Sequence, residues 1–271
     1  MLKIRGHLRN VAAIAACLAV ITMFGSCEKE DLTVTGKLLD TTTRGLFESR
    51  KFVYDKQNRI KEIGLYSGGK LKEKHLITYS GNDLTKLEFT YLDNGKIVFI
   101  DTRNFVKNGN TISYSMGVEV IEGEEEGNQN INCTITLNND GSIEKTEQAL
   151  FGMTWVGYYT YTNDNLTKKQ YITTGYGSVE TNEKNYTYSQ YRSAYSGDNT
   201  PKWFMIFYFD QNASHNAIIK SEYFSIDAMG FRMTGLTTYE YVYDRDGFPT
   251  KCTERDDGSD EQVVIEYKYK H

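Results

Sequence analysis

The sequence predicts an all-β fold, an antiparallel up-and-down meander of about 14–16 strands that closes into a barrel or barrel-like shell. The chain of 271 residues holds 21 Tyr but only two Pro, and tyrosine favours strands whereas proline interrupts their pairing. Apolar and polar residues alternate along many segments, which indicates strands with one buried and one wet face. Asn-Gly and Asp-Gly pairs between these segments supply the turns of hairpins.

The alternation is clearest in four segments, where aromatic or aliphatic residues occupy every second position. These segments are 87–91, 112–118, 239–243 and 265–269. Polar turns separate the strands, among them 93–95, 107–110, 138–141 and 244–247. The segment 203–209 is apolar on both faces, and we expect a strand that is covered on both sides. No segment shows helical periodicity over three turns.

A long meander must protect its two edge strands, and closure into a barrel does so. An open single sheet, a sandwich and a coiled β-shell are the alternatives. We expect one β domain over residues 49–271, because no Pro-rich or Ser-rich linker follows residue 50.

The N-terminus is predicted to be an export signal. Lys3, Arg5 and Arg9 precede an apolar stretch over 11–24, which is shorter than the ~20 residues of a spanning helix. Phe24-Gly-Ser-Cys27 resembles the lipobox of bacterial lipoproteins. This resemblance implies a signal peptide over 1–26, a lipid on Cys27 that anchors the chain to a membrane, and a polar tether over 27–48. The acidic segment 28–31 resembles the surface-export signal of Bacteroidetes-type lipoproteins, and an ordinary acidic linker is the alternative.

Two further segments resemble known families. Residues 52–60 are similar to the Tyr-Asp repeats of bacterial cell-surface shell proteins. The tail, 239–251 and 266–269, resembles a Bacteroidetes-type lipoprotein family of unknown function with a porin-like β-barrel fold, over residues 45–271. The resemblance implies a porin-like β-barrel fold and an outer-membrane lipoprotein, which would be exposed at the cell surface if segment 28–31 is an export signal. It implies no catalytic residue.

A barrel that itself spans the membrane is the less favoured alternative. The second face of the strands carries charges that would cost a few kcal/mol each against lipid, unless that face lines a polar lumen. These residues are Lys86, Glu88, Lys145, Glu147, Lys168 and Glu266.

Several function classes lack their signatures in this chain. The formal charge of −5 does not give the basic footprint of a nucleic-acid-binding protein. Zinc spacings, P-loops, nucleophile elbows and dinucleotide fingerprints do not occur, so we predict no catalytic residue, metal or cofactor. Cys133 and Cys252 follow the lipobox, and export would permit a disulfide, although Cys133 shares a predicted strand face with apolar residues.

Clustered aromatic residues are the candidate ligand-binding site, because exposed rings stack on ligands, although core packing is the alternative for most of them. The candidates are Trp155, Tyr159, Tyr161, Tyr176, Tyr188, Tyr191, Tyr195 and Trp203. We therefore expect a non-enzymatic envelope lipoprotein that binds a glycan or peptide. A structural or interaction subunit of an outer-membrane complex and a carbohydrate-active enzyme are the alternatives.

Overall fold

A computed structural model of the chain describes residues 36–120 and 132–270. The expected signal peptide, Cys27 and the first part of the expected tether lie outside the described residues. The part that follows forms a unit over Gly36–His271, so its start precedes the domain boundary expected at residue 49.

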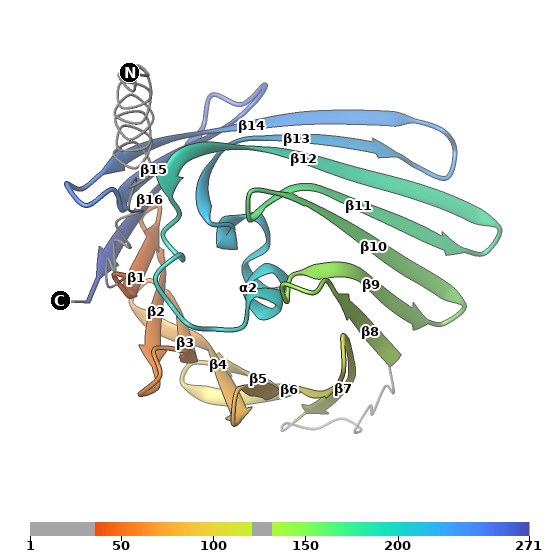
Figure 1. Cartoon of the computed structure of the whole chain (residues 1–271), viewed down its shortest axis with the longest axis horizontal. Coiled ribbons are helices and arrows are strands. Elements are labelled where there is room, and N and C mark those ends of the chain that lie inside the picture. The colour runs from red at the N-terminus through yellow and green to blue at the C-terminus, as the bar shows by residue number, and fades with distance from the viewer. Residues whose placement is uncertain (1–35, 121–131, 271) are drawn as a thin grey trace, which may run out of the picture. The chain divides into compact units, whose positions relative to one another are not determined.

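The unit is a closed barrel of sixteen antiparallel strands, in which each strand pairs with the next and β16 pairs with β1 (Figure 1). The expected meander and its closure are therefore confirmed. The first eight strands are β1 (Leu39–Arg44), β2 (Glu48–Tyr54), β3 (Ile60–Ser67), β4 (Lys70–Ser80), β5 (Asp83–Asp93), β6 (Lys96–Asn108), β7 (Thr111–Val120) and β8 (Asn132–Leu137). The others are β9 (Ile143–Leu150), β10 (Met153–Thr162), β11 (Asn165–Gly175), β12 (Ser178–Arg192), β13 (Asn216–Ile226), β14 (Arg232–Tyr243), β15 (Pro249–Asp256) and β16 (Gln262–Tyr269).

The up-and-down order gives the barrel two different ends. We call one end the mouth; it carries the described turns β1–β2, β3–β4, β5–β6, β9–β10, β11–β12, β13–β14 and β15–β16. The opposite end, which carries the turns from β2–β3 to β14–β15 and the β12–β13 connection, is the base. Lys270 donates its backbone N–H to Leu38 at 2.8 Å, so the described chain enters and leaves at the base.

Two-residue turns with positive φ at both positions connect several hairpins, which is the type I′ geometry that suits twisted strands. Asn94 and Gly95 form one of them, with φ of 48° and 82°. The turns Phe151-Gly152 and Tyr176-Gly177 have the same geometry, with φ of 49° at Phe151 and 51° at Tyr176. A bulky aromatic residue is unusual at this position, which favours Asn, Asp or Gly.

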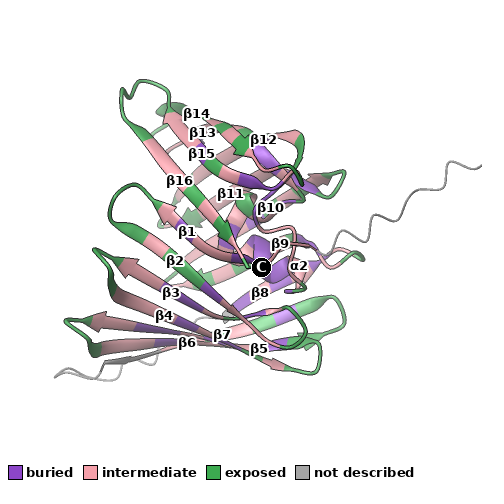
Figure 2. Cartoon of the chain, turned by 90° about the vertical axis from the view of Figure 1, so that its left-hand side faces the viewer, coloured by how far each residue is buried: buried purple, intermediate pink, exposed green. Residues whose placement is uncertain are grey.

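The faces of the strands differ in chemistry as the alternation predicts. Phe52, Ile63 and Phe89 point inward and are buried, in one cross-strand register that also includes His75. Figure 2 shows the buried positions recurring along the strands. The outer wall carries ion pairs, namely Glu62–Lys74, Lys86–Glu88, Lys145–Glu147, Lys168–Glu183, Lys220–Glu222 and Glu240–Arg255. The charged face is therefore the outside of the barrel.

The strand expected over 203–209 is wrong, because this segment forms the helix α2 (Lys202–Phe209). It lies inside the barrel (Figure 1), where Trp203, Phe204 and Phe209 are buried. A helix surrounded by apolar side chains is apolar all round and has no amphipathic period. A short apolar run of this kind cannot be assigned to helix or strand from periodicity alone.

The connection between β12 and β13, residues 193–215, forms a plug that includes α2 and the 3₁₀ helix η1 (Asp210–Ala213). Rings of α2 pack on inward rings of several strands: Phe52 contacts Phe209, Phe89 contacts Tyr208, and Phe105 contacts Trp203. At the base, Lys202 binds the carboxylates of Asp140 and Asp164 at 2.7 and 3.1 Å, in two different turns. Asn199 donates its N–H to Asn58 at 3.0 Å. The plug thus lies inside the lumen and is bound to three turns of the base.

Cys133 and Cys252 are both free and buried. Cys133 lies on the inward face of β8 with Ile135 and Leu137, as its strand pattern predicts. In the described ranges, no helix is both long enough and apolar enough to cross a bilayer.

Candidate functional site

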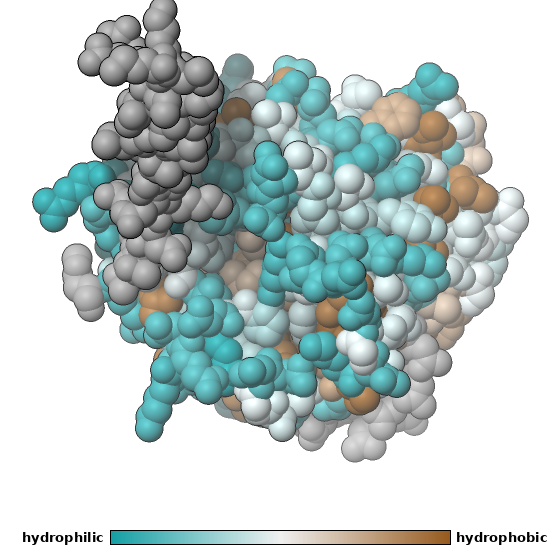
Figure 3. All heavy atoms as spheres, in the orientation of Figure 1, coloured by the Kyte–Doolittle hydropathy of each residue, from teal (hydrophilic) through white to brown (hydrophobic). Residues whose placement is uncertain are grey.

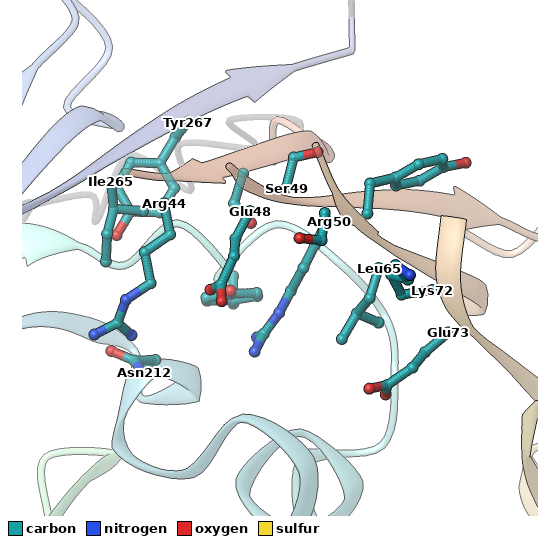
Figure 4. A pocket seen from close by; sticks show the side chains of 14 residues that line it. Arg44, Glu48, Ser49, Arg50, Leu65, Lys72, Glu73, Asn212, Ile265 and Tyr267 are labelled. Atoms are coloured by element: carbon teal, nitrogen blue, oxygen red, sulfur yellow. The ribbon is translucent and has the colours of Figure 1, made fainter. Parts of the chain in front are cut away.

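A cavity of about 340 Å³ opens at the mouth between the plug and the strands β1–β4 and β16. Its wall combines charged groups with hydroxyl and amide groups, and it has only two aliphatic residues. Figure 4 shows most of these side chains pointing into the cavity, with Asn212 of η1 at its floor. The lining residues are Thr42, Arg44, Glu48, Ser49, Arg50, Leu65, Tyr66, Ser67, Lys72, Glu73, Tyr195, Asn212, Ile265 and Tyr267.

Strand register brings the lining residues together from distant parts of the sequence. Arg50 on β2 pairs with Thr42 on β1 and with Leu65 on β3, and Leu65 pairs with Glu73 on β4. Closure of the barrel adds Tyr267, which pairs with Thr42 across the β1–β16 seam. These side chains share one inward row, since neighbours directly opposite in a sheet lie on the same face.

A β-bulge contributes one further cation to the cavity. The register between β3 and β4 shifts between Leu65 and Tyr66, whose partners are Glu73 and Leu71. Lys72 is therefore the extra residue of β4. Bulges re-aim a side chain that regular alternation would point away, and Lys72 lines the cavity beside Glu73.

The charges of the cavity are only partly compensated within the protein. The Arg44 guanidinium lies 3.3 Å from the Glu254 carboxylate. Within the described part of the chain, Arg50, Lys72 and Glu48 form no ion pair. Burial raises the pKa of Tyr195 at the floor, and the nearby Arg50 guanidinium opposes that rise. The cavity thus offers two cations and one carboxylate without an ion pair, and it also contains the carboxylate of Glu73.

A hydrogen-bonded chain connects the cavity with the plug. Glu73 Oε2 lies 3.1 Å from His75 Nε2, and His75 Nδ1 contacts the hydroxyl of Tyr208 on α2. Burial lowers the pKa of His75 despite the opposing effect of Glu73, and burial raises the pKa of Tyr208. In the neutral state, the imidazole donates one N–H to Glu73 and accepts the hydroxyl proton of Tyr208. These two hydrogen bonds hold Glu73 in place at the edge of the cavity.

The structure disperses the eight aromatic candidates, and of these only Tyr195 lines the cavity. Trp203 is buried in the plug, while Tyr159, Tyr161 and Tyr188 pack against the core. Tyr191 is exposed and lies against Tyr243 with ring centroids 4.5 Å apart. Tyr176 stands at the tip of the β11–β12 turn, and Trp155 is half-buried on β10. No single site brings these eight residues together.

Sequence reasoning missed the charged residues of the cavity, although a signal for them exists. Arg50 is in phase with the inward residues Phe52 and Tyr54, and Glu73 is in phase with His75 and Ile77. A charge that occupies the buried face of an alternating strand needs a partner or an opening to water. The charged residues Arg50 and Glu73 on the inward faces of their strands could therefore have indicated a polar cavity.

The mouth also carries exposed apolar residues on adjacent hairpin tips. Phe151 is 69% exposed and Tyr176 is 81% exposed, and the Tyr176 hydroxyl donates to the Phe151 carbonyl at 2.7 Å. In the next hairpin, β13–β14, Met229 and Phe231 are 80% and 65% exposed. Figure 3 shows brown patches at the right edge, where Figure 1 places the turns of β9–β14. We call these four residues the apolar tips.

Clusters of three or more metal-ligating side chains do not occur among the described residues. No family model matches the chain, and no curated protein matches it. Among solved structures, the chain is similar to a porin-like protein from Bacteroides vulgatus. The two share 15% sequence identity and have a TM-score of 0.47, and the match covers 86% of this chain and 99% of that one. A porin-like protein from Bacteroides uniformis has 12% identity, a TM-score of 0.39 and coverage of 87% and 98%.

Proposed function

We propose that the chain is a non-enzymatic lipoprotein of the outer membrane that binds a glycan or peptide ligand in the cavity at the mouth of its barrel. The observation that carries this proposal is the cavity itself, because it combines uncompensated charges with Tyr195 and Tyr267 in an accessible space. Binding sites are typically concave, with a few polar groups that orient the ligand. The signal sequence and the lipobox at Cys27 support export and anchoring.

The outer wall supports a tethered domain rather than a barrel that crosses the bilayer. Cross-strand pairs such as Glu62–Lys74 and Lys168–Glu183 occupy the outward face. Charged side chains that face lipid cost about 2–4 kcal/mol each for lysine near the bilayer midplane. A polar lumen would allow the charged face to point inward in a membrane-spanning barrel. Here the lumen contains the apolar core, so the charged face is the one that would contact lipid.

The point of attachment would orient the mouth away from the anchor. Lys37 at the start of the unit binds Asp244 and Asp246 in the β14–β15 turn at 2.7 and 2.6 Å, which places the beginning of the barrel at its base. The segment from Cys27 to Gly36 spans at most about 30 Å when fully extended. A lipid on Cys27 would therefore hold the base near the membrane and leave the mouth free for a ligand.

Three experiments test this proposal. Cys27→Ala should release the protein from the membrane fraction, and protease added to intact cells should remove the domain if it is surface-exposed. Full protection of a domain that is cleaved after lysis would contradict surface exposure. Calorimetry against envelope and host glycans and peptides should detect binding, and a complete lack of binding across the panel would contradict the ligand-binding role. Cleavage products from any glycan would instead favour a carbohydrate-active enzyme.

The apolar tips favour a second candidate function, an interaction subunit of an outer-membrane complex. Exposed apolar patches often mark protein contacts, and two of these rings also occupy strained turn positions. Affinity capture from detergent-solubilised envelope should then recover a stoichiometric partner. A variant with Met229→Ser and Phe231→Ser should lose that partner. Leu46→Ser, at the exposed tip of the β1–β2 hairpin, which the β15–β16 hairpin separates from β13–β14, should keep it.

A further inference from the structure

The cavity at the mouth has a chemistry that narrows the class of ligand, an inference that rests on the proposed binding function. We propose that it binds an acidic saccharide, with the guanidinium of Arg50 holding the carboxylate or sulfate of the sugar. Lys72 assists from the bulge of β4, and the remaining polar groups bind hydroxyls of the sugar.

The position of Arg50 makes it the anchor of the anionic group. It stands in the inward row between Thr42 and Leu65, with exposed surface and without an ion pair among the described residues. An arginine can donate two parallel N–H bonds to a carboxylate, and such charge-assisted pairs are stronger than neutral hydrogen bonds. Arg44 is the less suitable anchor, because Glu254 already lies 3.3 Å from it.

Neutral polar groups around Arg50 distinguish a sugar from a peptide. Thr42, Ser67 and Asn212 line the wall, together with Tyr195 and Tyr267, whereas Leu65 and Ile265 are the only aliphatic lining residues. Sugar rings present many hydroxyls and need a high density of donors and acceptors, while peptide side chains need apolar pockets. Glu48 and Glu73 add acceptors for sugar hydroxyls at either side of Arg50.

The test compares a saccharide with and without its charge on the purified chain. The probes are trigalacturonate, its fully methyl-esterified form, a sulfated disaccharide and the peptide Asp-Asp-Asp, each titrated by calorimetry at low and high salt. We expect trigalacturonate or the sulfated sugar to bind at least tenfold more tightly than the ester, with an affinity that falls as salt rises. The two acidic probes distinguish a uronate from a sulfate.

Variants then assign the binding to the cavity. Arg50→Gln should remove the preference for the acid over the ester, and Lys72→Gln should reduce it. Lys51→Gln is the matched control, because Lys51 is the next residue of β2 and lies exposed on the outer face; it should retain wild-type affinity. Circular dichroism and the melting temperature verify that each variant is folded.

Three results would overturn the proposal. The first is an ester that binds as tightly as the acid, or an Arg50→Gln variant that keeps the preference; ligand binding itself would then stand. The second is tighter binding of Asp-Asp-Asp than of any saccharide, which would indicate a peptide site. The third is binding of no acidic probe, in which case the wider panel of neutral glycans and peptides decides separately whether the cavity binds a ligand at all.

Discussion

The substitution Asp198→Asn should stabilise the folded protein at neutral pH. Asp198 belongs to the plug, and its carboxylate accepts the N–H of Thr200 at 2.7 Å. Burial raises the pKa of Asp198 from 3.8 to about 6, although its hydrogen bonds with Thr200 oppose the rise. Asparagine can accept the same bond from Thr200 without carrying a charge. The perturbation therefore removes the ionisation and keeps the contact.

The magnitude follows from the difference between the two pKa values. A difference of about two pKa units corresponds to about 3 kcal/mol. The folded state binds the proton more tightly, so this contribution is fully present below the unfolded pKa near 3.8 and is lost as pH rises to 6. The free energy of unfolding of the wild type should thus fall across this window, and the Asp198→Asn variant should not show that fall.

Urea denaturation, followed by the intrinsic fluorescence of Trp155 and Trp203, measures the effect at pH 4 and pH 7.5. The advantage of Asp198→Asn over the wild type should grow by up to about 3 kcal/mol between these values. Asp140→Asn provides a control of opposite sign, because Lys202 lowers the pKa of Asp140 to about 2. That variant should be the less stable protein at neutral pH, and its deficit should vanish as pH falls through the range from 3.8 to 2. An advantage of Asp198→Asn that does not change with pH would refute the reasoning.

Three further outcomes are expected. Gly157→Ala should lower the unfolding free energy by about 1–3 kcal/mol, because a Cβ there would lie 2.8 Å from the Tyr171 ring. Gly235→Ala should cost less, because the nearest neighbour of its Cβ lies at 3.8 Å. Equal losses in the two variants would contradict the packing argument. Phe151→Asn should raise the unfolding free energy by about 1 kcal/mol in urea titrations, since asparagine tolerates the positive φ of this exposed turn; a loss of stability would show that the ring is held by contacts. Burial raises the pKa of Cys252 to about 12, so thiol reagents at pH 8 should label it only after unfolding, and rapid labelling of the native protein would disprove its burial.

The barrel could be predicted from the sequence because strand alternation and turn chemistry are local. Residues such as Tyr239, Tyr241 and Tyr267 fall on the inward face that their spacing indicates, and burial raises the pKa of each of them. The pairing of β1 with β16 that closes the barrel could not be predicted in this way, because β1 lies in the Thr-rich segment that the sequence predicts to be a tether. Arg44, which that segment contributes to the cavity, was therefore not placed in the barrel.

The plug and the cavity were beyond prediction for different reasons. The segment 202–209 has no amphipathic period, because the barrel surrounds it on all sides. The cavity depends on register across several strands and on one bulge, which no single segment encodes. Tyr195 and Asn212 reach its floor only because the plug folds back into the lumen.

The attachment of the plug has a consequence for the cavity at the mouth. Residues 193–215 join two neighbouring strands and are bound to turns of the base, so the plug is attached to the barrel at both of its ends and by contacts between them. Tyr195 and Asn212, the plug residues at the floor of the cavity, are therefore attached to the barrel through both ends of the plug. A ligand in the cavity would contact the strands and the plug together, so its binding would couple the stability of the two.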